Sequence, residues 1–204
     1  MNREYRNMVM EIEEREDEQM IVKGYASTFN EPYTLYEDEG YTFREEVSER
    51  AFDSTDMSDV IMQYDHQGRV FARKSNNTLM VTPDEKGLYI EADLGGTELG
   101  RQLYEEIRGG YTNKMSFGFT VSGDEMVTND TGGHVDVLRT ITDIGKLYDV
   151  SAVSIPANDS TSISIRSLTD GVICEIEAER LQAEELELAK QRTKTKARIL
   201  GGKK

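Results

Sequence analysis

The chain changes its character near Thr169, and this change limits the folds that it can adopt. Before that point, short runs rich in β-branched and aromatic residues alternate with turns that contain Gly, Pro, Asn and Asp, which is typical of strands. From Glu175 to Lys196 the residues are mainly Glu, Lys, Arg, Gln, Leu and Ala, which favour helix. We therefore expect one mainly β domain with some helix over residues 1–168, and a tail over 169–204.

The expected elements follow from periodicity and turn residues. One helix is well marked, with Thr97 as its N-cap, three apolar residues four apart, and Gly109-Gly110 at its end. Ser48 is a possible cap of a second, short helix. The candidate strands are residues 5–12, 21–29, 60–66, 79–82, 88–92, 114–122, 135–144 and 147–155, and a short one at 163–165.

The tail is acidic at its start and basic at its end, and its apolar residues keep no clean heptad. One interpretation is a solvated helical or partly disordered segment. The other is a segment that docks on a partner or is removed.

Composition excludes several classes of function. The net charge of −15 disfavours binding to nucleic acid through a basic surface and favours basic or neutral protein partners. No apolar run is long enough to cross a bilayer, and no signal-peptide stretch is visible, so we expect a cytoplasmic protein. The single cysteine, Cys174, excludes an internal disulfide, and with two histidines a His/Cys metal site is not expected.

The strand at residues 114–119 contains the first candidate for chemistry. Because side chains alternate along a strand, Ser116 and Gly118 share one face, and the core face carries Met115, Phe117 and Phe119. The missing side chain of Gly118 would let a substrate backbone approach, and a hydroxyl on a firm strand is suited to be a nucleophile. Taken alone, the pattern is weak, because a serine in a half-buried strand is more often only a small polar residue.

A nucleophilic serine needs a base, and the chain offers two histidines. His66 ends an apolar strand and precedes a Gln-Gly pair, where an imidazole can face a cleft. His134 lies in a hairpin tip rich in Gly, Asn and Asp, which is a poor place to hold a base. A carboxylate should orient the imidazole, and residues 141–151 offer two candidates, Asp143 and Asp149.

Taken in order, these pieces resemble the prohead, or capsid maturation, proteases of tailed bacteriophages, a family similar in fold to the herpesvirus assemblins. The resemblance covers most of residues 22–161. Its segments are Gly24–Phe29, Ala51-Phe52, Asp65-His66, Asp84–Leu88, Glu91-Ala92, Met115–Phe119, Asp149–Ser151 and Ser154–Asn158.

The resemblance implies a fold and a set of roles. The fold would be a mostly antiparallel β-barrel with a few packed helices. His66 matches the family's histidine and Ser116 its serine. For the third catalytic residue we predict Asp143, with Asp149 as the alternative, and Arg139 is a possible donor to the oxyanion. No metal and no cofactor are expected.

The implied function is a serine endopeptidase that works inside the assembling procapsid in the host cytoplasm. It would cleave the scaffold segment of the major capsid protein, or a separate scaffold, and itself. Homo-oligomers are possible, whereas a membrane or direct contact with nucleic acid is not expected. Two alternatives stay open. One is a non-enzymatic scaffold or capsid-binding protein. The other is a serine hydrolase with Lys114 as its base, which we expect to be poorly placed in the strand.

Overall fold

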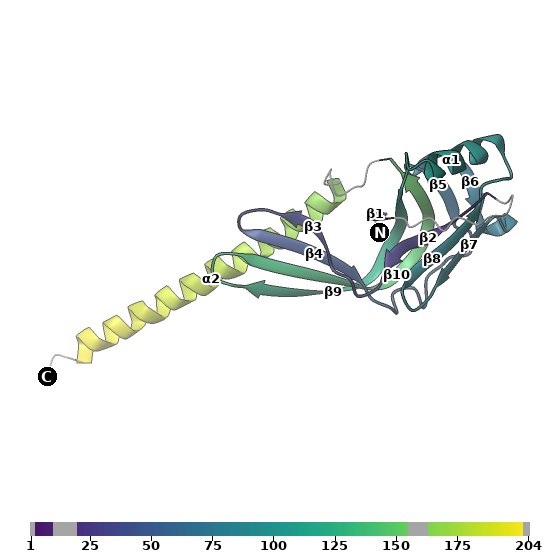
Figure 1. Cartoon of the computed structure of the whole chain (residues 1–204). Coiled ribbons are helices and arrows are strands. Elements are labelled where there is room, and N and C mark those ends of the chain that lie inside the picture. Colours follow the sequence, from purple (N-terminus) through teal and green to yellow (C-terminus); the bar gives the residue numbers. More distant parts are fainter. Residues whose placement is uncertain (1–2, 10–19, 155–162, 202–204) are drawn as a thin grey trace. The chain divides into compact units, whose positions relative to one another are not determined.

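The computed structural model describes residues 3–9, 20–154 and 163–201 of the chain. Its contacts divide the chain into two units, Met1–Ser162 and Ile163–Lys204 (Figure 1). In chain order the elements are β1 (Glu4–Val9), β2 (Ile21–Thr28), β3 (Tyr33–Glu37), β4 (Tyr41–Val47), β5 (Ile61–Tyr64), β6 (Gln67–Arg73), a 3₁₀ turn (Lys74–Asn76), β7 (Leu79–Pro83), β8 (Gly87–Asp93), α1 (Glu98–Arg108), β9 (Lys114–Asp130), β10 (Val135–Val153) and α2 (Ile163–Gly201).

The larger sheet is organised around β10. Its order is β1-β9-β10-β4-β3, and β5 and β6 branch from β10. β10 runs antiparallel to β9 over nearly its whole length. The β3–β4 hairpin lies beside the half of this long ladder that contains residues 135–141 (Figure 1). On its other side, β10 pairs in parallel with β4 through residues 135–141 and then with β5 through residues 149–152. One edge of a single strand thus holds two partners in succession.

The second sheet has the order β2-β8-β7 and closes the core against the first. Apolar side chains from both sheets and from α1 form one buried cluster, which includes Val22 and Ile90 of the second sheet and Leu103 and Ile107 of α1. The large sheet contributes Met115, Phe117 and Phe119, all at most 1% exposed. Burying each of these side chains contributes roughly 1.5–3 kcal/mol, which fixes the strand that carries them.

The prediction of a mainly β fold with some helix is confirmed, but the expected barrel is not. Within the described residues the strands form two open sheets, because β1, β3 and β6 end the larger sheet and no ladder joins it to the smaller one. The pairings of β10 with β4 and β5 are moreover parallel. The likeness to the herpesvirus proteases stays a prediction.

Several local predictions are confirmed and others are corrected. The side chain of Thr97 accepts a hydrogen bond from the backbone of Gly100 and caps α1 as expected. The segment after Ser48 forms turns instead of a helix. The two strands predicted at 135–144 and 147–155 are one continuous strand. The strand expected at residue 163 is the start of α2, and the proposed boundary at Thr169 lies inside that helix.

Part of the N-terminal strand prediction, and the segment 155–158 of the resemblance, lie outside the described residues. No helix in the described part of the chain is both long and apolar enough to cross a membrane.

Candidate active site

Ser116 lies on β9, on the face opposite the core residues Met115 and Phe117, as the alternation predicts. The rings of Phe117 and Phe119 stack with centroids 4.6 Å apart and anchor the strand from below. Ser116 is itself fully buried. A substrate carbonyl can therefore reach its hydroxyl only after neighbouring side chains have moved.

His66 occupies a two-residue turn between β5 and β6. Tyr64 pairs with Gln67 across the turn, and the two central residues, Asp65 and His66, have φ angles of 48° and 57°. Positive φ at both central positions is the type I′ geometry that matches strand twist, and Asp and His tolerate it better than most residues do. The Asp65 carboxylate accepts hydrogen bonds from the backbone N–H of Ser154, at 2.9 Å, and from its hydroxyl, at 2.8 Å. This ties the turn to the end of β10.

The turn brings the imidazole of His66 onto Ser116. The distance from Nε2 to the serine Oγ is 2.5 Å, and the distance from Nδ1 to Asp149 Oδ1 is also 2.5 Å. Because a carboxylate only accepts, Nδ1 carries the proton and Nε2 is left to accept the serine O–H. The three groups thus form one continuous relay of hydrogen bonds from Asp149 through His66 to Ser116.

Asp149, and not Asp143, takes the position beside the histidine. Asp149 is fully buried, and its Oδ1 also accepts a hydrogen bond of 2.8 Å from the hydroxyl of Ser151, while Arg3 donates to its Oδ2. Asp143 is exposed and lies next to Gly123. Asp149 lies six positions after Asp143 along the strand, which is about 20 Å at the usual rise. The prediction that Asp143 orients His66 is therefore wrong about its placement.

The reason lies in irregularities of β10 that no periodicity reveals. The pairing of β10 with β9 shifts register several times between Ile141 and Asp149. Beyond these bulges, Asp149 lies opposite Gly118 and Ser151 lies opposite Ser116. Since residues directly opposite in a ladder share a face, the site face of the two strands carries Ser116, Gly118, Asp149 and Ser151 together.

Gly118 has a different role from the one that the sequence suggested. A Cβ at this position would meet Asp149 Oδ2 at 2.6 Å, Tyr5 Cε1 at 2.9 Å and Arg3 Nε at 3.0 Å. The space above Gly118 is therefore filled by the site's own side chains. Glycine at this position admits the Asp149 carboxylate and the side chains of Arg3 and Tyr5, and not the backbone of a substrate.

The other candidates of the sequence analysis lie elsewhere or make other contacts. His134 Nε2 is 2.8 Å from Thr42 Oγ1. Lys114 lies two residues before Ser116 and leaves the same face of β9, so alternation does not separate them as we expected. His66 is distinguished from Lys114 by its contact with the serine, because its Nε2 lies within hydrogen-bond distance of the Ser116 hydroxyl.

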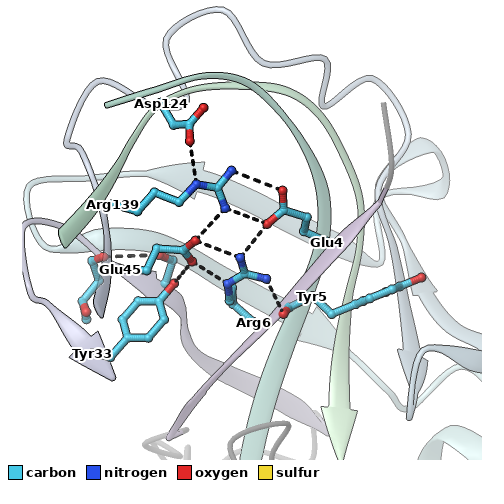
Figure 2. A network of polar contacts seen from close by, with 9 residues as sticks. Glu4, Tyr5, Arg6, Tyr33, Glu45, Asp124 and Arg139 are labelled. Atoms are coloured by element: carbon cyan, nitrogen blue, oxygen red, sulfur yellow. Dashed lines mark hydrogen bonds and ion pairs between the residues drawn. The ribbon is translucent and has the colours of Figure 1, made fainter. Parts of the chain in front are cut away.

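Arg139 belongs to a buried ion network instead of an oxyanion site (Figure 2). Its guanidinium donates to Glu4 at 3.0 Å, to Glu45 at 2.9 Å and to Asp124 at 2.7 Å. Glu4 belongs to β1, where it lies opposite Phe119 on the core side of the ladder. Arg139 is therefore on the face of the sheet that Ser116 does not use, and it is not placed to stabilise an oxyanion at the serine.

The same network contains Arg6, which pairs with both oxygens of Glu45 and with Glu4 (Figure 2). Burial would lower the pKa of Arg6, but the charge of Glu45, the hydrogen bonds to it and the charges of Tyr33 and Glu4 together outweigh burial and raise that pKa above its ordinary value. Burial likewise acts to raise the pKa of Glu4, and the hydrogen bond from Arg139 and the charges of both arginines lower it overall. Burial and the charge of Glu45 raise the pKa of Tyr33, whose hydroxyl donates to Glu45 at 2.6 Å.

Sequence reasoning missed three residues around the site, namely Arg3, Tyr5 and Ser151. The spacing of Asp149 and Ser151, two apart on a strand, was a usable signal because it puts both on one face. Arg3 and Tyr5 carried none, since they lie more than a hundred residues from Asp149 in the chain. Among the described residues, no group of three or more His, Cys, Asp or Glu side chains is arranged to hold a metal ion.

Comparison with known proteins gives this geometry a context. The model of one protein family, the caudovirus prohead serine proteases, matches residues 7–171. Among solved structures, the capsid assembly protease gp21 of bacteriophage T4 matches with a TM-score of 0.44 and 12% identity, over 76% of this chain and 98% of that one. No curated protein matches significantly. Since the family model spans most of the sequence, the chain belongs to the caudovirus prohead serine protease family.

Proposed function

We propose that the chain is a serine endopeptidase in which Ser116 is the nucleophile, His66 is the general base and Asp149 orients the imidazole. The observation that supports this best is the unbroken relay of two 2.5 Å contacts, from Asp149 Oδ1 to His66 Nδ1 and from His66 Nε2 to Ser116 Oγ. Membership of a serine protease family supports the same reaction class.

In this mechanism, Nε2 of His66 takes the hydroxyl proton as Ser116 Oγ bonds to the carbonyl carbon of the scissile peptide. The imidazolium then gives the proton to the leaving amine, the C–N bond breaks, and an acyl-enzyme remains. Water then adds to the ester carbonyl as the same nitrogen takes its proton. The bond from the carbonyl carbon to Ser116 Oγ breaks, and the imidazolium returns the proton to Oγ, which releases the acid and restores the serine. Asp149 stabilises the transient positive charge of the imidazole, and it is well suited to this because it is buried and only accepts hydrogen bonds.

The proposed substrates are segments of the capsid or scaffold protein within the procapsid, and the chain itself. Membership of a prohead protease family supports the first class. The net charge of −15 favours binding to proteins over binding to nucleic acid, which supports protein segments inside the procapsid as the substrates.

The test uses the purified full chain and a fluorophosphonate, which reacts with activated serines. We expect one adduct, located on Ser116 by peptide mass mapping, and cleavage of an unfolded capsid protein by the same sample. Ser116→Ala and His66→Ala should each abolish both activities while the circular dichroism spectrum is retained. The double variant should lose no more than either single variant, because residues that act as a unit are not additive.

An exposed serine provides the matched control. Ser75 lies in the 3₁₀ turn and is exposed, so Ser75→Ala should react at the rate of the unchanged chain. A chain that forms no adduct on Ser116 and cleaves nothing, or full activity in Ser116→Ala, would overturn the proposal.

A further inference from the structure

The side chains on the two faces of β1 make different contacts. Its backbone pairs with β9 so that Tyr5 lies opposite Gly118, on the site side, while Glu4 and Arg6 lie opposite Phe119 and Phe117, on the other side. Toward the site, the Tyr5 ring packs on the imidazole of His66 with centroids 4.3 Å apart. Away from the site, Glu4 and Arg6 enter the buried ion network (Figure 2).

Arg3, just before β1, is held against the carboxylate of Asp149. It donates to Oδ2, the oxygen that His66 and Ser151 do not use. Its guanidinium lies 4.4 Å from the ring centroid of Tyr148 and 5.3 Å from that of Tyr5. A cation between two aromatic rings is restrained in orientation as well as attracted. Arg3 is therefore held in place by several contacts, although 34% of its side chain is exposed.

The ion network fixes the register that makes this contact possible. β1 is a short strand that pairs, among the described strands, with β9 alone. A slip by one residue would exchange its two faces, and would put Glu4 instead of Arg3 and Tyr5 toward the site. In the slipped register, Glu45 would lose Arg6 and Arg139 would lose Glu4, which is costly for buried charges, while the pairs of Arg139 with Glu45 and Asp124 would remain. The pairs that Glu4 and Arg6 make in this network therefore favour the observed register of β1.

We propose, on the basis of the function proposed above, that Arg3 is a positioning residue of the catalytic site. By holding Oδ2 of Asp149, it keeps Oδ1 directed at Nδ1 of His66. Its positive charge also offsets the charge of the carboxylate, so that Asp149 orients the imidazole without holding it in the protonated form that cannot act as a base. The catalytic arrangement is thus completed by the N-terminal strand, which lies far from the rest of the site in sequence.

Other ionisable groups also face His66. Asp149 faces it from β10 and Tyr5 faces it from β1. Within its own turn, the carboxylate of Asp65 is engaged by Ser154. Arg3 is the cation that the described contacts place on the Asp149 carboxylate, so its removal should leave that charge without compensation.

The experiment compares five full-length proteins: the unchanged chain, Arg3→Gln, Arg3→Lys, Arg3→Ala and the control Arg50→Gln. Arg50 makes an exposed ion pair with Asp53, so its substitution removes the same charge at a distance from the site. The second-order rate of fluorophosphonate attachment to Ser116 is measured between pH 5 and 9. Thermal unfolding is followed in parallel.

We expect Arg3→Gln to lower the plateau rate by roughly ten-fold and to raise the midpoint of the pH–rate profile by about one pH unit, the usual effect of one nearby charge. Arg3→Lys should restore the midpoint, because it restores the charge, and Arg50→Gln should match the unchanged chain. In Arg3→Ala, added methylguanidinium should restore part of the rate, since it supplies the missing group.

The failures can be told apart. If the unchanged chain does not react at Ser116, the proposed function falls and this inference falls with it. If the unchanged chain reacts and Arg3→Gln has the same plateau and midpoint, only the role of Arg3 is overturned. A lower plateau in step with a lower unfolding temperature, with the midpoint unmoved and no recovery in Arg3→Lys, would mean that Arg3 only stabilises the fold.

Discussion

Asp149 lies directly opposite Gly118 in the β9–β10 ladder, and its Oδ2 atom is 2.6 Å from where a Cβ on Gly118 would stand. The carboxylate fits between the strands and the histidine only because this position has no side chain. Adding a single methyl group at position 118 is therefore a sensitive test of the packing in the site.

Gly118→Ala should displace the Asp149 carboxylate, Tyr5 and Arg3 while leaving the core face of β9 unchanged. We expect a loss of about 1–3 kcal/mol in the free energy of unfolding from the overpacking. The rate of fluorophosphonate attachment should fall by about a hundred-fold, as small displacements of catalytic groups commonly cause. Gly133→Ala is the control, because nothing lies within 4 Å of a Cβ there. Equal rates in the two variants would contradict the packing that we describe.

Substitutions of Asp149 and Asp143, both on β10, should differ sharply in their effect on turnover. In Asp149→Asn the amide can accept only through one oxygen, so the imidazole loses its fixed tautomer, and we expect turnover to fall by about three to four orders of magnitude. Asp143→Asn should change turnover by less than about two-fold, because Asp143 is exposed and has no described contact with the site. Steady-state cleavage of an unfolded capsid protein measures both, and the opposite ranking would return the role to Asp143.

Activity should rise with pH. A histidine base must be neutral to accept a proton, and an unperturbed imidazole titrates near ~6.5. The rate of acyl transfer should therefore be low at pH 5, should increase through neutral pH and should level off above it. A profile that is flat from about pH 5 to 8 would argue against a histidine base.

The ion network predicts a separate effect of pH on stability. Despite its burial, the pKa of Glu4 is lowered in the folded protein from its usual 4.5, through Arg139 and Arg6. A lowered pKa in the folded state means that the stabilisation is complete above the usual value and disappears as the pH falls through the folded value. The unfolding temperature should thus decrease below about pH 4.5, and it should decrease less steeply in Glu4→Gln. Identical slopes would mean that Glu4 does not contribute to the acid sensitivity.

The segment after Thr169 should be dispensable for the chemistry, and we propose that it directs the protease into the procapsid and is lost on activation. The family match ends at residue 171, and the described side chains of α2 are mostly exposed, including Leu181, Leu186 and Leu188. A chain that ends at Asp170 should stay folded and should still react at Ser116, yet should fail to enter procapsids during co-assembly. Aggregation of that chain, or loss of its reactivity, would show that the tail completes the fold.

The strand that carries Ser116, the proposed nucleophile, could be predicted because its signal is local. Alternation alone assigned Met115, Phe117 and Phe119 to the core and Ser116 to the opposite face, and Thr97 marked the start of α1. The turn of His66 was also visible as a strand end. Each of these features depends only on residues that are close together in the sequence, so local steric preferences are enough to predict it.

The proposed role of Asp149 and the contacts of the N-terminal strand could not be predicted in the same way. The choice between Asp143 and Asp149 depends on bulges in β10, which change the register without a regular sequence signature. The roles of Arg3 and Tyr5 depend on pairing between β1 and β9, across more than a hundred residues. In the sequence, alternating charges such as those of Arg3, Glu4 and Arg6 look the same as an ordinary solvated edge strand.

The bulges between Ile141 and Asp149 also make the length of this segment matter more than its composition. Exchanging one side chain for another leaves the inward and outward order of β10 intact. Deleting or inserting a single residue would shift everything that follows by one position, and would turn Val150 toward Ser116 and drive the Asp149 carboxylate into the apolar core between the sheets. An unpaired charge there would cost several kcal/mol, a large part of the stability of a domain of this size. At the positions of this segment that are not buried, such as Thr142 and Asp143, the protein should tolerate a change of residue identity, but nowhere in the segment should it tolerate a change in residue number.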